Sequence, residues 1–147
     1  MSLADAVVPR EPDERSGGIV RILVADDQEA VRKRICAILV SRRDFEVCAE
    51  ASTGMEALEK AKALNPDLII LDITMPVLNG LDAARLIRAA MPTASILILS
   101  VHQSKQLVAE ARRIGVQGYV TKEEGGRRLV QAVDAVLQHQ TFFPTET

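Results

Sequence analysis

Several side chains capable of chemistry stand at the ends of short apolar runs in this sequence. Asp26 and Asp27 follow the run 20–25, and Asp72 follows the run 68–71. Ser100 ends a run of Ile and Leu residues, and Lys122 follows the run 116–121. Short apolar runs bounded by turn residues are typical of buried strands. If these strands are parallel, all five side chains lie at the edge of the sheet where open α/β folds bind ligands.

The residue types at this edge point to phosphoryl transfer. Three carboxylates close together repel and raise one another's pKa unless a cation lies between them. Mg²⁺ prefers oxygen ligands and keeps several waters, which leaves room for a phosphate oxygen. The amine of Lys122 and the hydroxyl of Ser100 can hold a phosphoryl group while it is transferred to Asp72. Taken singly, the aspartates would be turn or cap residues, and only their convergence with Lys122 favours a site.

The elements that must position these side chains alternate regularly along the chain. The pattern predicts strands over 20–25, 45–51, 67–72, 94–101 and 116–121. Apolar residues at helical spacing predict helices over 29–41, 53–64, 81–91, 104–114 and 123–139. Five βα units of this length predict an α/β fold: a single doubly wound, five-stranded parallel sheet with helices on both faces and right-handed crossovers.

Some local features carry expectations of their own. Thr53 and Glu56 have capping-box spacing at the start of the second helix. Met55, Leu58 and Leu64 give that helix a partial apolar stripe. The pair 125–126 is Gly-Gly, which costs helix stability, and we expect it to loosen the chain near Lys122.

Composition sets limits on the class of protein. The chain has 147 residues and suits one folded domain, which we place at 19–140. We interpret residues 1–18 as a flexible leader, and residues 141–147 as a C-terminal tail that begins a linker, with no effector domain present. A net charge of −2 and an aromatic content of 3% give no case for nucleic acid or an anionic membrane as a direct partner.

Cys36 and Cys48 are predicted to be reduced and buried. With no signal peptide and no membrane-spanning run, the expected location is the cytoplasm.

These motifs together resemble the receiver domain of two-component response regulators. The matching pieces are Ile22-Leu-Val-Ala-Asp26-Asp27, Leu71-Asp72-Ile-Thr-Met75-Pro76 with Gly80, Leu99-Ser100, and Gly118-Tyr119-Val-Thr-Lys122. The resemblance spans about Arg21 to His139. Within the family the chain is most similar to NarL/LuxR-type transcription regulators, from Val24-Ala-Asp-Asp27, Asp72-Ile-Thr-Met-Pro76 and Thr141-Phe-Phe-Pro144. The resemblance implies a flavodoxin-like fold with strand order 2-1-3-4-5.

The resemblance also implies roles for individual residues. Asp72 would accept a phosphoryl group from a histidine kinase, while Ser100 and Lys122 hold its oxygens. Mg²⁺ would be bound by Asp72, directly by Asp27, mainly through water by Asp26, and by the backbone carbonyl of Thr74. Tyr119 matches the aromatic that moves inward when Ser100 is drawn to the phosphate; alternatively, it is a half-buried strand residue.

The remaining implications concern tuning, partners and output. Thr74 and His102 match positions that set how fast water removes the phosphate, although His102 is equally compatible with a plain surface residue. The protein would be a signalling switch rather than an enzyme. Its output face would be the fourth helix, fifth strand and fifth helix. A homodimer would use that face or the first and fifth helices. Transcription would be controlled only through a helix-turn-helix domain absent from this chain.

Three rival classes fit the residues less well. A haloacid-dehalogenase-type phosphatase needs a second aspartate two residues after its nucleophile, where this chain has Thr74. A flavodoxin-like carrier needs a hydroxyl-rich phosphate loop after the first strand, where Asp26 and Asp27 would repel phosphate. A pseudo-receiver that only binds partners would lack part of the constellation, yet every part is present.

Overall fold

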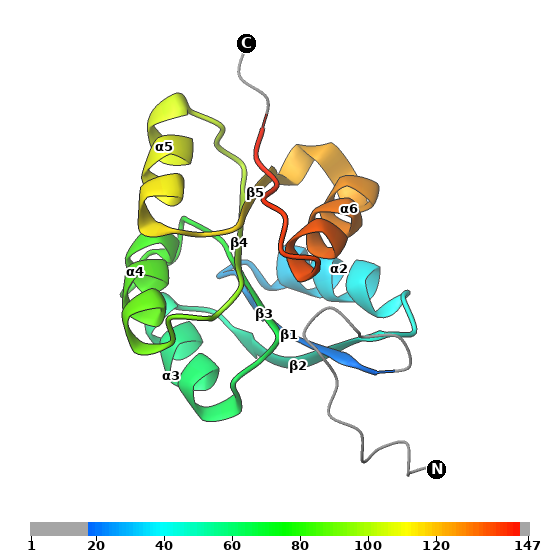
Figure 1. The fold of residues 1–147 in the computed structure, drawn as a ribbon. Coiled ribbons are helices and arrows are strands. Elements are labelled where there is room, and N and C mark those ends of the chain that lie inside the picture. The colour runs from blue at the N-terminus through cyan, green and yellow to red at the C-terminus, as the bar shows by residue number, and fades with distance from the viewer. Residues whose placement is uncertain (1–17, 145–147) are drawn as a thin grey trace.

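A five-stranded parallel sheet forms the centre of the molecule in the computed structural model, which describes residues 18–144 (Figure 1). The strands lie in the order β2-β1-β3-β4-β5. This result confirms the predicted fold class and strand order. The elements along the chain are β1 (Val20–Ala25), α2 (Glu29–Val40), β2 (Phe45–Ala51), α3 (Gly54–Leu64), β3 (Leu68–Leu71), α4 (Gly80–Ala90), β4 (Ile96–Ser100), α5 (Lys105–Ile114), β5 (Gly118–Thr121), the 3₁₀ turn η1 (Lys122–Glu124) and α6 (Gly125–Leu137).

Two apolar cores lie on opposite faces of the sheet. One is shared with α3, α4 and α5, and the other with α2 and α6 (Figure 1). Alternation along the central strand β3 supplies both cores: Ile69 and Leu71 face the first, and Leu68 and Ile70 face the second. Because both faces are covered, the strand is a continuous apolar run rather than an alternating one.

Side-chain caps start three of the helices. The hydroxyls of Thr53 and Ser104 accept hydrogen bonds from the backbone N–H of the residue three positions on, and the Asn79 side chain does the same. The capping box predicted for Thr53 and Glu56 is half confirmed. The Glu56 carboxylate accepts from the backbone N–H of Ser52 at 2.8 Å rather than from that of Thr53.

The limits of the predicted elements lie within two residues of those observed, and the final helix differs by two residues at both ends. Predicted from residue 123, it begins as the 3₁₀ turn and becomes α-helical only at Gly125, because Gly125 has φ of +86° and interrupts the helical geometry. Gly126 brings α6 against α2, since a Cβ there would lie 3.2 Å from the Ile38 side chain. Local geometry therefore explains both glycines: Gly125 adopts a positive φ, and Gly126 allows close contact with α2. The loosening effect predicted for this pair stays a prediction.

The apolar stripe predicted for α3 is wrong in part. Met55 and Leu64 are exposed, and only Leu58 of the three packs on the core. The buried face is made instead by Ala57 and Ala61. Small side chains let this helix approach the sheet closely, so volume rather than hydrophobicity decides which residues lie inward.

The two cysteines are half-buried rather than fully buried as predicted. Cys36 lies on α2 and Cys48 on β2, and both are free thiols. Burial raises the pKa of both thiols, which keeps them protonated and poorly nucleophilic. Among residues 18–144, no helix combines the length and apolar character needed to cross a membrane.

The segment after α6 returns to the sheet and lies along β5 (Figure 1). Phe142 pairs with Gly118 in a parallel bridge: its carbonyl accepts from the Tyr119 N–H at 2.8 Å and its own N–H donates to the Gln117 carbonyl at 2.9 Å. Phe142 packs on the core beneath α6, and Phe143 packs on the opposite core. The start of the predicted tail therefore covers part of the open edge of the sheet. The leader predicted at 1–18 lies outside the described residues, apart from Gly18.

Candidate functional site

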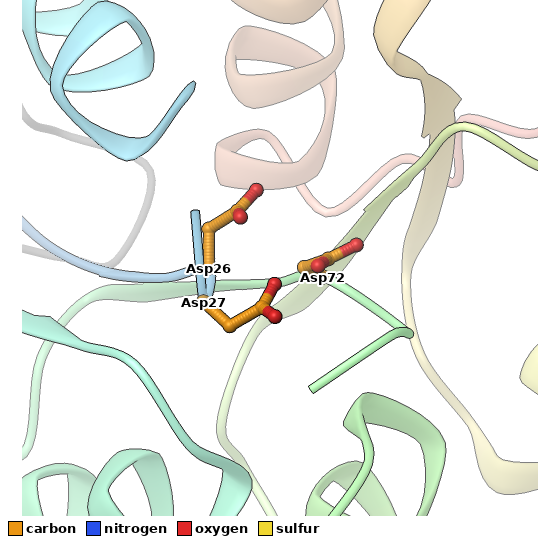
Figure 2. Close-up of side chains that lie close together, drawn as sticks. All are labelled: Asp26, Asp27 and Asp72. Atoms are coloured by element: carbon orange, nitrogen blue, oxygen red, sulfur yellow. The ribbon is translucent and has the colours of Figure 1, made fainter. Parts of the chain in front are cut away.

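The parallel sheet brings the predicted polar side chains to one edge. Asp26 and Asp27 follow β1 and Asp72 follows β3, and these strands are neighbours. Backbone hydrogen bonds fix both turns, since the Asp26 N–H donates to the Ala51 carbonyl at 2.9 Å and the Asp72 N–H donates to the Ala25 carbonyl at 3.0 Å. Oxygen atoms of the three carboxylates lie within 4.8 Å of one another (Figure 2).

Lys122 reaches into this cluster from the end of β5. Its Nζ lies 2.6 Å from Asp26 Oδ2 and 3.4 Å from Asp72 Oδ1, and its side chain is only 12% exposed. The amine therefore bridges two buried carboxylates from neighbouring strand ends. Such a position suits a point charge that can also attract an incoming anion.

The oxygen atoms of the cluster can take a metal ion. Asp26 is 1% exposed, and its Oδ2 is paired with Lys122 by charge but accepts no hydrogen bond of normal angle. Its other oxygen accepts from the Gln28 N–H at 2.9 Å. A buried carboxylate oxygen that accepts no hydrogen bond is available as a metal ligand. The carboxylate of Asp27, which is exposed, lies beside it. Hard divalent cations with oxygen ligands fit this set.

Asp72 is held in an unfavourable environment for a charge. It is 4% exposed, and burial, followed by repulsion from Asp26, raises its pKa to about 6. The amine of Lys122 and the backbone N–H of Thr74 act in the opposite direction, but they do not cancel the effect. A cation bound among the carboxylates would relieve this repulsion, which is a physical reason for a metal at this place.

Ser100, His102 and Tyr119 form a connected group next to the cluster. The Ser100 hydroxyl accepts from the His102 backbone N–H at 3.0 Å, and the Tyr119 hydroxyl donates to the His102 carbonyl at 2.6 Å. Tyr119 is 1% exposed, so it is more deeply buried than the half-buried strand residue of the alternative, and its role as a switch stays a prediction. Ser100 is paired in register with Thr121, immediately before Lys122. Thr74 and His102 are exposed, which is compatible with a tuning role and, for His102, equally with a plain surface residue.

Sequence reasoning gave no role to two residues that shape the site. A Cβ on Gly80 would lie 2.1 Å from the Asp72 carbonyl oxygen, so only glycine lets α4 begin against this turn. Arg32 on α2 donates to the carbonyl of Asp26 at 2.8 Å. Gly80 could have been singled out from its place in the motif after Asp72, whereas nothing in the local sequence distinguishes Arg32 from its neighbouring basic residues.

Comparison with known families agrees with this geometry. The family model described as the response regulator receiver domain matches residues 22–134. This chain belongs to that family. The receiver is a signalling module rather than an enzyme in the usual sense, as the sequence predicted.

Individual relatives are consistent with the predicted subgroup. The receiver is 37% identical over 128 residues to the transcriptional regulatory protein LnrK of Bacillus subtilis, which covers 87% of this chain and 58% of LnrK. A LuxR-family two-component response regulator from Aurantimonas superposes with a TM-score of 0.82 at 34% identity, covering 85% of this chain and 89% of that one. The chain thus spans a little more than half the length of the curated relative.

One solved structure concerns the metal. In a complex of CheX with CheY, BeF₃⁻ and magnesium from Borrelia burgdorferi, a chain with 28% identity superposes with a TM-score of 0.78 and covers 82% of the receiver and 91% of that chain. The carboxylate cluster of the present receiver is consistent with a metal site.

Proposed function

We propose that this receiver takes a phosphoryl group from a histidine kinase onto Asp72 in the presence of Mg²⁺. The observation that carries the proposal is the position of Lys122, whose amine lies between two buried carboxylates at strand ends. An oxygen of the Asp72 carboxylate attacks phosphorus, the P–N bond of a phosphohistidine breaks, and its electron pair returns to the imidazole nitrogen. Charge on the transferring oxygens is what this site must stabilise.

Each residue of the site has a role in that step. Asp26, Asp27, Asp72 and the Thr74 carbonyl would hold Mg²⁺, which supplies charge neutralisation for the phosphoryl oxygens. Lys122 then moves from its carboxylates to a phosphoryl oxygen, and the Ser100 hydroxyl donates to another. Thr74 and His102, at the exposed rim, set how readily water reaches the phosphate.

The output of the switch would lie on the face of α5, β5 and α6. Drawing Ser100 and Lys122 toward the phosphate pulls on the ends of β4 and β5, and Tyr119 keeps its inward position while Ser100 is engaged. Allosteric couplings of this kind are about 1–3 kcal/mol, so the resting states must be similarly close in free energy. The same face, or α2 with α6, would serve a homodimer.

The whole protein would control transcription from the cytoplasm. Support comes from the LuxR-family likeness and from the length of LnrK, of which this chain covers 58%. DNA would then be bound by a helix-turn-helix domain outside this chain. The receiver itself has a net charge of −2, which offers no electrostatic basis for binding DNA.

The test uses a small phosphodonor such as acetyl phosphate, with and without Mg²⁺, followed by intact mass spectrometry. Wild type should gain the mass of one phosphoryl group only with Mg²⁺, and Asp72→Asn should gain none. Glu59→Gln, an exposed position on α3, is the matched control and should behave as wild type. Equal phosphorylation of wild type and Asp72→Asn would refute the assignment of Asp72.

A further inference from the structure

A single arginine joins the metal-site turn to the neighbouring strand. Arg32 lies in the second turn of α2, with its side chain 14% exposed. Its Nη1 donates to the Asp26 carbonyl at 2.8 Å, and its Nε donates to Glu50 Oε1 on β2 at 2.8 Å. The guanidinium therefore spans the gap between the β1–α2 turn and β2.

The far end of this bridge is itself fixed. Glu50 Oε2 accepts from the Lys33 amine at 3.0 Å, and the Glu50 backbone carbonyl accepts from the Lys60 amine of α3 at 2.5 Å. Hydrogen bonds from Arg32 and then Lys33 lower the pKa of the Glu50 carboxyl, so it stays ionised at neutral pH. An ionised carboxylate within hydrogen-bond distance holds the guanidinium in one orientation.

We propose that Arg32 is a positioning residue for the metal site. By holding the carbonyl of Asp26, it fixes the turn from which the Asp26 and Asp27 carboxylates project. The inference rests on the proposed function, because it concerns the Mg²⁺ that phosphorylation of Asp72 would need. Residues that orient metal ligands without touching the metal often matter for affinity by about 10–100-fold.

A positioning role and a simple charge effect predict opposite changes in Mg²⁺ affinity when Arg32 is removed. A guanidinium near the carboxylate cluster repels a divalent cation, so removing only its charge would strengthen Mg²⁺ binding. Removing its hydrogen bond to Asp26 instead frees the turn, and the ligands must then be ordered when the ion binds. If positioning dominates, loss of Arg32 weakens binding in spite of the more negative site.

The experiment measures Mg²⁺ affinity by titration calorimetry on wild type, Arg32→Met, Arg32→Lys and Lys33→Met. We expect Arg32→Met to lose about tenfold in affinity. Arg32→Lys should lie between it and wild type, because a lysine amine can still donate one hydrogen bond to the Asp26 carbonyl but cannot form the two-ended bridge. Lys33→Met removes one positive charge from the same Glu50 carboxylate without touching Asp26. It should bind Mg²⁺ as wild type does or slightly more tightly.

Phosphorylation by acetyl phosphate gives a second readout. If Arg32 acts through metal affinity, the Arg32→Met rate should recover to wild type at saturating Mg²⁺. Mg²⁺ affinity in Arg32→Met equal to or tighter than in wild type overturns the inference and leaves the proposed function intact. A wild type that binds no Mg²⁺ at all overturns both.

Circular dichroism and urea unfolding establish whether each variant is folded. If Arg32→Met does not fold, Glu50→Gln decides the matter, because it leaves Arg32 in place but weakens its anchor. We expect Glu50→Gln to lower Mg²⁺ affinity less than the loss of Arg32 does, by about two- to fivefold. Unchanged or increased affinity in Glu50→Gln then overturns the inference.

Discussion

Replacing the central carboxylate by an amide should stabilise the metal-free receiver. Asp72 is buried beside Asp26, and its pKa of about 6 in the folded protein exceeds the ordinary value of 3.8. The folded state therefore binds a proton more tightly than the unfolded state. Asp72→Asn keeps the shape of the side chain and removes the charge that the pocket disfavours.

The size of this stabilisation and the pH range over which it changes follow from the raised pKa of Asp72. A difference of about two pKa units corresponds to roughly 3 kcal/mol. The stability contributed by protonated Asp72 is fully present below pH 3.8 and is lost as the pH rises through about 6. Because an amide reproduces only part of the hydrogen bonding of a protonated carboxyl group, we expect a net gain of about 1–2 kcal/mol at pH 7.5. The gain should shrink at pH 5, where wild type recovers its proton.

Urea unfolding followed by circular dichroism measures this difference, and EDTA keeps the protein free of metal. Glu59→Gln on α3 is the matched control, since it removes an exposed carboxylate outside the pocket. Added Mg²⁺ should make wild type more stable than Asp72→Asn, because an ion at a hundred times its dissociation constant stabilises wild type by about 2.7 kcal/mol. A metal-free Asp72→Asn less stable than wild type at pH 7.5 would refute the account of burial and repulsion at this site.

Three further substitutions test other parts of the structure. Gly80→Ala should prevent normal folding or lower the free energy of unfolding in urea by about 3 kcal/mol or more, because its Cβ would lie 2.1 Å from the Asp72 carbonyl oxygen. Gly115→Ala is the control: its Cβ has room but its φ is positive, so it should cost about 1 kcal/mol. Tyr119→Phe removes the hydrogen bond to the His102 carbonyl and should cost about 1 kcal/mol in the same assay. Phe142→Ala should speed hydrogen exchange of the Tyr119 amide, which donates to the Phe142 carbonyl, and an unchanged exchange rate would show that the C-terminal segment does not protect β5.

The sheet and the carboxylate cluster could be predicted because their signals are local and strong. A buried parallel strand is a continuous apolar run, and Asp26 and Asp72 stand directly after two such runs. Alternation of strands with helices then leaves few topologies open. Convergence at one edge follows from parallel geometry alone, without knowledge of any side-chain contact.

Features decided by volume or by long-range pairing could not be predicted. The pattern of α3 favoured Met55 and Leu64, but close packing selected Ala57 and Ala61. The partnership of Arg32 with the Asp26 carbonyl joins a helix to a turn through a side chain that looks like any surface arginine. Hydrophobic pattern is a weak guide wherever small size or a single directed hydrogen bond decides the structure.

The four residues of β5 connect the site to the covered edge of the sheet. Thr121 lies beside Ser100 and directly before Lys122, so any movement of these two site residues acts on the end of this strand. Two positions earlier, Tyr119 bonds to the Ser100–His102 turn through its hydroxyl and to Phe142 through its amide. β5 is thus bonded to β4 on one side and to Phe142 on the other. The segment that follows α6 is therefore connected through β5 to the strand end that carries Lys122.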